Sequence, residues 1–321
     1  MVSLAPMDSH TKTTIFQAGL AGGLAGAFTR AVSQPLDVLK IRFQLQIEPI
    51  GKGSKYSSMA QATAAMIREE GIATLWSGHM PAQCLSITYG VIQFSVFEEL
   101  TNLCRSCDKL YLNHKNWLNF ANGSIAATVA TVASYPFDTI RTRLIAEQKT
   151  KKAYKGSTHA FTAMVKTEGI PALFKGLNPT LGQIAPHAGM QFAVYKIFKD
   201  SVFTNIPYFN RKTTDKHKVT TLTANLLSGS ISGCVAKTAI YPFDLVKKRL
   251  QIQGFQHHRK FFGKQMYCNG LIHCVRLTIA EEGFLALYKG YLPSMLKAML
   301  VTALHFAAYD EIKLQFKKSE S

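Results

Sequence analysis

One signature occurs three times in this chain, and it constrains the fold more than any other feature. In each copy a proline is followed two positions later by an acid, and bases stand three and five positions after that acid. The residues are Pro35, Asp37, Lys40 and Arg42; Pro136, Asp138, Arg141 and Arg143; and Pro242, Asp244, Lys247 and Arg249. Recurrence at a fixed spacing about a hundred residues apart predicts three copies of one structural unit.

A second signature follows each copy of the first at a matching distance. It consists of an acid and glycine, then an aromatic residue and another glycine: Glu70, Gly71, Trp76 and Gly78; Glu168, Gly169, Phe174 and Gly176; and Glu282, Gly283, Tyr288 and Gly290. Three residues later stands Pro81, Pro179 or Pro293, a residue suited to the first turn of a helix. Each unit is therefore predicted to contain a long helix, a short amphipathic helix and a second long helix.

The long segments are long enough to cross a membrane. We expect them over residues 14–44, 77–103, 117–146, 177–200, 220–252 and 291–316. Each exceeds the roughly 20 residues that span a bilayer. The predicted fold is an all-α membrane protein with six transmembrane helices in three pseudo-symmetric repeats, at residues 12–107, 114–204 and 216–317.

The charge of the chain indicates an acidic partner. The sequence has 321 residues, a net charge of +18 and 47% hydrophobic residues. Nucleic acid, anionic lipid head groups and phosphorylated solutes all fit this charge, which does not choose among them. The close cysteine pair Cys104 and Cys107 lacks the second ligand pair of a zinc site, and no metal or cofactor is predicted.

At these two signatures the chain resembles the mitochondrial carrier family. The family pattern is Pro-x-acid-x-x-base-x-base, followed by acid-Gly and aromatic-base-Gly. The resemblance implies a monomeric barrel of tilted helices in the mitochondrial inner membrane, with short helices on the matrix side and transport by alternating access. It also implies cardiolipin at the N-termini of the short and the even-numbered long helices, where phosphate binds readily. Ser77 departs from the pattern, because a base is usual there, and this removes one expected lipid contact.

The resemblance assigns the acid and first base of each repeat to a matrix gate. The expected pairs are Asp37 with Arg141, Asp138 with Lys247, and Asp244 with Lys40. Gln44 and Gln251 look like the family's glutamine braces, whereas Ile145 leaves the middle copy without one. Charges at membrane depth are expensive, which favours a conformational role over simple stabilisation.

A second gate is expected on the cytoplasmic side. It follows the family's aromatic-acid-x-x-base motif, and Glu98 with Lys199 is its clearest expected pair. The residues of this gate are Phe97, Glu98, Tyr195, Lys199, Tyr309, Asp310 and Lys313.

The substrate site is expected deeper in the cavity. Residues seven positions before each gate acid lie two turns along the same helix face, about 10 Å away; they are Arg30, Thr131 and Lys237. The family's contact points on the even helices fall on Leu85, Gln183 with Ile184, and Lys297, while Gln93 and Gln191 occupy further equivalent positions. Arg30, Lys237 and Lys297 form an asymmetric set of cations, which suits a ligand with one strongly anionic end.

Within the family, these three cations and the runs 82–97 and 177–192 resemble the members that carry thiamine pyrophosphate. That resemblance implies exchange of cytosolic thiamine pyrophosphate for a matrix nucleotide. Nucleotide and coenzyme A carriers also need several cavity cations, so they stay open as alternatives. A basic soluble nucleic-acid-binding protein is the rival from another class, but here the bases follow helix prolines and carboxylates rather than exposed aromatic residues. We expect no nucleic-acid partner. An enzyme is not expected, since no P-loop, dinucleotide-binding motif or nucleophile motif is present.

Overall fold

The structure, a computed structural model, describes residues 9–47, 55–105, 108–147, 153–198, 216–255 and 266–304. Its long helices are α1 (Ser9–Leu45), α3 (His79–Arg105), α4 (Asp108–Ala146), α6 (Leu177–Ile197) and α7 (Lys216–Gln251), and residues 291–304 are also helical. The short helices are α2 (Met59–Glu70), α5 (Ser157–Glu168) and α8 (Leu271–Glu282). Each short helix is followed by a 3₁₀ turn: η1 (Ile72–Trp76), η3 (Ile170–Phe174) and η6 (Phe284–Tyr288). The predicted order of long, short and long helix is confirmed in all three repeats.

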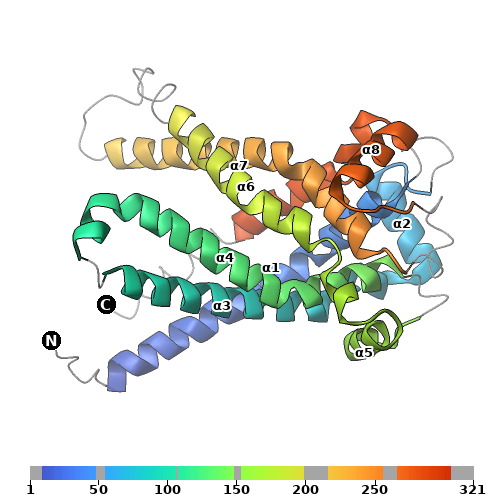
Figure 1. Ribbon diagram of the computed structural model, residues 1–321, viewed down its shortest axis with the longest axis horizontal. Coiled ribbons are helices and arrows are strands. Elements are labelled where there is room, and N and C mark those ends of the chain that lie inside the picture. Colours follow the sequence, from blue (N-terminus) through green and yellow to red (C-terminus); the bar gives the residue numbers. More distant parts are fainter. Residues whose placement is uncertain are drawn as a thin grey trace.

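The three short helices lie at the same end of the molecule, on the right in Figure 1, while the long helices run along its longest axis. Within each repeat the two long helices lead to and from this end, and α3 also packs along α4 and α6 along α7. Among the residues that the structure describes, no helix combines the length and the apolar character needed to cross a membrane.

The short helices begin and end through local chemistry. The Ser58 hydroxyl caps α2 by accepting a hydrogen bond from the backbone N–H of Gln61, a common way to satisfy a free donor at a helix start. Gly71, Gly169 and Gly283 end the three helices with φ values of 82°, 80° and 86°. A positive φ is strained for residues with a Cβ, which explains why the acid of the second signature is always followed by glycine.

The other glycine of the second signature brings neighbouring repeats close together. Gly176 has a φ of 85°, and a Cβ built on it would lie 2.9 Å from the carbonyl oxygen of Lys247. At Gly290 a Cβ would lie 2.7 Å from the carbonyl oxygen of Lys40, and at Gly78 it would lie 3.1 Å from that of Arg141. Each glycine therefore lies close to the backbone of the first base in the next repeat, and the third repeat contacts the first in this way.

The buried apolar residues gather at the end where the short helices lie. One cluster includes Val38, Leu45 and Met66 of α1 and α2, a second includes Ile140 and Met164 of α4 and α5, and a third includes Val246 and Cys274 of α7 and α8. Farther along the long helices many large apolar side chains are exposed, including Phe94, Trp117 and Phe192. The well-packed end thus positions the charged residues of both signatures.

Candidate substrate cavity and ion-pair ring

Three ion pairs join the proline-containing helices α1, α4 and α7 to one another. The Arg141 guanidinium lies 2.5 Å from the Asp37 carboxylate, the Lys247 ammonium 2.8 Å from that of Asp138, and the Lys40 ammonium 3.3 Å from that of Asp244. We call these six residues the inner ring. All three pairs predicted for the matrix gate are present, and each connects two different repeats.

Each acid of the inner ring has a second basic partner, which is a lysine in all three cases. Lys297 lies 2.7 Å from Asp37, Lys248 lies 2.9 Å from Asp138, and Lys237 lies 3.5 Å from Asp244. Lys237 and Lys297 were predicted to bind substrate, so their ammonium groups are shared with the ring in this state. Lys248 was not predicted, because the repeated signature has no base at its position in the other two copies.

Glutamine side chains add hydrogen bonds around the ring. The Gln251 amide donates to Asp138 at 2.9 Å, as expected of a brace. The Gln44 amide donates instead to the Tyr241 hydroxyl, at 3.1 Å. Gln34 accepts a hydrogen bond from Arg141 at 3.3 Å, so the pair between Asp37 and Arg141 gains a glutamine that the sequence did not indicate.

Beside the ring lies a cavity of about 370 Å³. Residues of α3, α6 and α7 line it: Tyr89, Gln183, Ile184, His187, Ala188, Lys237, Ile240 and Asp244. Three of these, Gln183, Ile184 and Lys237, were predicted to contact the substrate. The buried Oε1 atom of Gln183 has no hydrogen-bond partner among the described residues, so it is available to accept a hydrogen bond from a ligand.

The other predicted substrate residues are not among the described residues that line this cavity. The Arg30 guanidinium donates to the carbonyl oxygen of Ala82 at 3.2 Å, and the Thr131 hydroxyl donates to that of Ala127, one turn earlier, at 2.6 Å. Lys297 is paired with Asp37. The remaining three are Leu85 and Gln93, which are half-buried, and Gln191, which is exposed. Each of the three expected cations thus has a protein partner, and of the three only Lys237 lines this cavity.

Only part of the predicted cytoplasmic gate can be placed. Phe97 and Tyr195 are half-buried and Glu98 is exposed. The other four residues, Lys199, Tyr309, Asp310 and Lys313, lie outside the described residues.

The second base of each proline signature makes an ion pair within its own repeat. Arg42 binds Glu70 through two hydrogen bonds of 2.6 and 2.7 Å, and Arg249 binds Glu282 through two of 2.5 and 3.1 Å. Arg143 likewise binds Glu168. We call these three contacts the outer pairs. Both residues of each outer pair stand at fixed spacing in the sequence. The base belongs to the first signature and the acid to the second, and nothing in the sequence indicated that the two would form an ion pair.

The base of the second signature also joins the outer pairs. Lys175 lies 2.8 Å from Glu168, and Lys289 contacts Glu282. Both lysines thus bind an internal carboxylate, a contact that the sequence analysis did not predict. Ser77 has no ammonium group, so its main consequence is one cation fewer beside Glu70.

The environment of Glu168 changes its acidity. Burial raises the pKa of its carboxyl, but the hydrogen bonds and charges of Arg143 and Lys175 outweigh burial and lower the pKa below its ordinary value. Glu168 is therefore a carboxylate at neutral pH.

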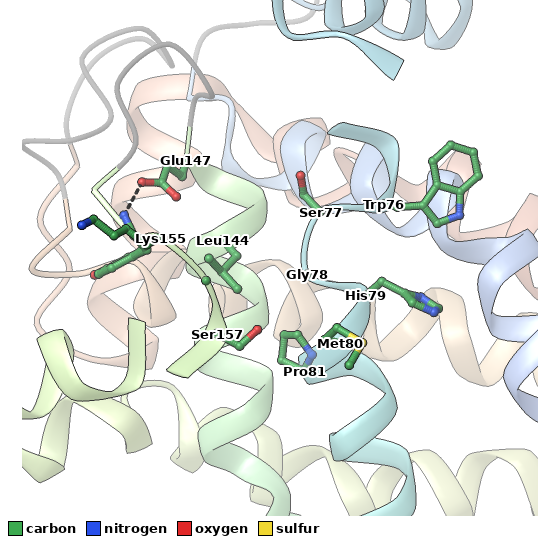
Figure 2. Close-up of a pocket in the computed structure, with 12 residues that line it drawn as sticks. Trp76, Ser77, Gly78, His79, Met80, Pro81, Leu144, Glu147, Lys155 and Ser157 are labelled. Carbon is green, nitrogen blue, oxygen red and sulfur yellow. Dashed lines mark hydrogen bonds between the residues drawn. The ribbon is translucent and has the colours of Figure 1, made fainter. Parts of the chain in front are cut away.

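Two further pockets lie between neighbouring repeats. Figure 2 shows the first, of about 250 Å³, where Gly78 to Pro81 at the start of α3 face Leu144, Glu147 and the start of α5. In it the Glu147 carboxylate accepts a hydrogen bond of 2.8 Å from the backbone N–H of Tyr154. The second pocket, of about 270 Å³, joins the start of α2 to residues 285–293. Both pockets include the first residues of a short helix and the first residues of the second long helix of a repeat.

Comparison with known proteins agrees with the repeated architecture. The family model described as "Mitochondrial carrier protein" matches residues 11–106, 113–205 and 218–320. The chain is 40% identical to the mitochondrial thiamine pyrophosphate carrier of Homo sapiens over 313 residues, which are 97% of this chain and 95% of that protein. It is 37% identical to mitochondrial thiamine diphosphate carrier 2 of Zea mays, covering 91% and 92% of the two chains. It is 31% identical to mitochondrial thiamine pyrophosphate carrier 1 of Coccidioides immitis, covering 92% of each.

Proposed function

We propose a substrate and a transport cycle for this chain, which belongs to the mitochondrial carrier family. It is a multi-pass protein of the mitochondrial inner membrane and a transporter rather than an enzyme. Its substrate is thiamine pyrophosphate, a small phosphorylated anion. The observation that supports this substrate is the near full-length similarity to thiamine pyrophosphate carriers of an animal, a plant and a fungus.

Transport proceeds by alternating access, in exchange for nucleotides on the matrix side. The inner ring is the matrix gate, and the three ring pairs close it in the present state. The cytoplasmic gate consists of the aromatic and charged residues at the far end of the second long helix of each repeat. A nucleotide or coenzyme A carrier of the same family is the second candidate, since such solutes also carry phosphates that need cavity cations.

The pyrophosphate group binds Lys237 and Lys297, with Arg30 completing the cationic site. Arginine can bind two phosphate oxygens at once, while lysine supplies a compact charge. Gln183 and Ile184 contact the organic part of the substrate in the cavity that they line. Leu85, Gln93, Thr131 and Gln191 belong to the same water-filled path at other depths.

Cardiolipin binds in the two pockets between repeats. Both pockets contain helix starts, where free backbone N–H groups and the helix dipole favour phosphate. The N-cap of α5 is Gly156, which has no side chain to occupy these donors. The protein works as a monomer, with its three repeats around one path, and nucleic acid is not a partner.

Exchange in liposomes tests the substrate. Purified protein is reconstituted, and uptake of thiamine pyrophosphate is measured against internal thiamine phosphates, nucleotides and coenzyme A. We expect thiamine pyrophosphate to be the preferred external solute and a nucleotide to support its exchange. Preference for a nucleotide or coenzyme A on both sides would favour the second candidate.

A variant tests the site. Lys297→Ala should abolish uptake of pyrophosphate-bearing solutes while the protein still inserts and folds. Lys166→Ala is the matched control, because Lys166 is an exposed lysine on α5. Unchanged uptake by Lys297→Ala would remove this lysine from the site.

A further inference from the structure

The inner ring together with the second lysine partner of each acid forms three nodes, each made of one acid and two cations. The first node joins α1 to α4 through Asp37 and Arg141, and its second cation, Lys297, comes from the helix over residues 291–304. The second joins α4 to α7 through Asp138, Lys247 and Lys248. The third joins α7 to α1 through Asp244 and Lys40, and its second cation, Lys237, lies on α7 itself, as Asp244 does. The nodes look equivalent by symmetry, but their second cations come from different places.

The second cations differ in how much solvent they meet. The side chains of Lys237 and Lys297 are 32% and 29% exposed, whereas that of Lys248 is 10% exposed. Lys237 also lines the cavity beside the ring. A soluble anion can therefore reach the second cations of the first and third nodes, but not that of the α4–α7 node.

Lys248 also has more protein partners than the two exposed lysines. Its ammonium lies 2.9 Å from each of three oxygen atoms, on Asp138, Thr142 and Gln251. These three contacts match the three donors of an ammonium group. An incoming phosphate would have to break all of them, whereas the ammonium groups of Lys237 and Lys297 each bind the carboxylate of one ring acid.

The sequence shows that Lys248 is peculiar to the third repeat. The residue six positions after the signature proline is Ile41 in the first repeat and Thr142 in the second. The threefold pattern thus does not require a base there, and Lys248 makes one connection of the ring unlike the other two.

We propose that substrate binding opens the matrix gate asymmetrically. The pyrophosphate group takes Lys297 from Asp37 and Lys237 from Asp244. The ring then holds α1 to α4 and α1 to α7 by one ion pair each, Asp37–Arg141 and Asp244–Lys40, and these connections give way first, whereas two lysines of α7 hold Asp138 of α4. Lys248 acts as a positioning residue that keeps α4 and α7 together. The inference rests on the proposed function and adds an order of events to it. A ligand shifts a conformational equilibrium only through contacts that differ between the two states, and these two exchanged lysines supply such contacts.

The short helices provide places to observe this motion. Each is tied to its own long helix by an outer pair, so α2 moves with α1, α5 with α4, and α8 with α7. Arg68, Lys166 and Ala280 are exposed and stand two positions before the acid of each short helix. A nitroxide label at two of these positions at a time reports the three distances between repeats.

The experiment uses the full chain in lipid nanodiscs, with native cysteines replaced and exchange activity verified, and inorganic pyrophosphate as the probe. Pulsed electron–electron double resonance measures the distances between the labels. Pyrophosphate should shift the α2–α5 and α2–α8 distances by about 2 Å or more. The α5–α8 distance should stay within the width of its ligand-free distribution. Equal shifts in all three distances, or no shift in any of them, would overturn the proposal.

Variants of Lys248 make the test specific. With Lys248→Gln, which can still donate hydrogen bonds but has no charge, pyrophosphate should also shift the α5–α8 distance. Lys248→Arg should restore the asymmetric response, and Arg276→Gln, which removes an exposed charge from α8, should behave as the wild type does. A symmetric wild-type response, or a Lys248→Gln response like that of the wild type, would contradict the role of Lys248. Thiamine pyrophosphate exchange by the same preparation decides the proposed function separately, because the distances depend only on pyrophosphate.

Discussion

The inner ring and the outer pairs use bases from the same short signature, yet they connect different parts of the molecule. The first base reaches an acid on a neighbouring repeat, as Lys40 reaches Asp244. The second base, two positions later, reaches the short helix of its own repeat, as Arg42 reaches Glu70. Two residues along a helix turn the side chain by about 200°, so the two bases point to opposite sides. One signature thus connects the first two helices of each repeat and also joins the repeats to one another.

The bases of the two sets of pairs also differ in burial, since those of the outer pairs are 0–3% exposed and the first bases of the ring 10–17%. The side chains of Arg42 and Glu70 are 0% and 1% exposed, and those of Arg249 and Glu282 are 3% and 1% exposed. In the ring, Lys40 and Asp244 are 15% and 21% exposed. A dry ion pair is costly to break because the remaining charge is left without compensation, whereas water or a ligand can replace a partner in a wetter pair. The outer pairs should therefore control stability, and the ring should control the conformational state.

The largest effect is expected from Arg42→Ala. It leaves Glu70 buried without its guanidinium partner, in the one repeat that has Ser77 in place of a lysine. The free energy of unfolding should fall by about 3–5 kcal/mol. Thermal unfolding in detergent, followed by tryptophan fluorescence, measures the loss. Arg143→Ala is the matched comparison and should lose less, because Glu168 keeps Lys175 and is 19% exposed. Equal losses for both variants would contradict this account of the outer pairs.

Lys40→Gln should give the opposite balance of effects. Asp244 retains Lys237, and the pair is partly exposed, so the stability loss should be about 1 kcal/mol or less. The closed matrix gate should nevertheless weaken, which would raise the release of solute from preloaded liposomes without external counter-substrate. A stability loss as large as that of Arg42→Ala, with unchanged release, would mean that ring and outer pairs do not differ as described.

Ser77→Lys tests whether the first repeat lacks one cation. A lysine there should contact Glu70 as Lys289 contacts Glu282 in the third repeat. We expect a small gain, below about 1 kcal/mol, because Arg42 already binds Glu70 through both carboxylate oxygens. The gain should disappear when Glu70 is replaced by glutamine, and a destabilised Ser77→Lys protein would argue against a vacant place for the ammonium.

The smallest effect concerns pH. Glu168 has a lowered pKa in the folded protein, so its contribution to stability is complete above the unfolded value of about 4.3 and is lost as the pH falls through the folded pKa. Glu168→Gln should therefore be less stable than the wild type at neutral pH, and the difference should shrink below about pH 4. Unfolding temperatures recorded across this range provide the measurement. A difference that grows on acidification would have the wrong sign.

The sequence was sufficient to predict the repeats, because these depend on spacing along single helices, and the family resemblance supplied the pairs of the ring. Asp37 and Arg141 lie on different repeats, but the recurrence of the signature and the family resemblance indicated their pairing. Of the lone C-x-x-C, the Cys104 thiol shares hydrogen-bonding contacts with Asn122, and Cys107 lies outside the described residues.

What the sequence did not indicate depends on contacts between segments. Glu70 and Arg42 belong to different signatures, and only the packing of α2 against α1 joins them. Lys248 looked like an ordinary base beside Lys247, because its three partners come together only when α4 meets α7. Lys297 was assigned to the substrate, but periodicity cannot show that an acid on α1 lies within 2.7 Å of its ammonium.

The glycines that contact the following repeat have a consequence for inherited or engineered variation. At Gly290 a methyl group would press on the Lys40 carbonyl, at a joint between two bodies rather than inside either of them. An alanine there should leave each repeat well formed. Its methyl group should push the two repeats apart and favour the conformation that opens to one side of the membrane. A lesion of this kind would escape screens for misfolding and would appear only as altered sidedness of transport.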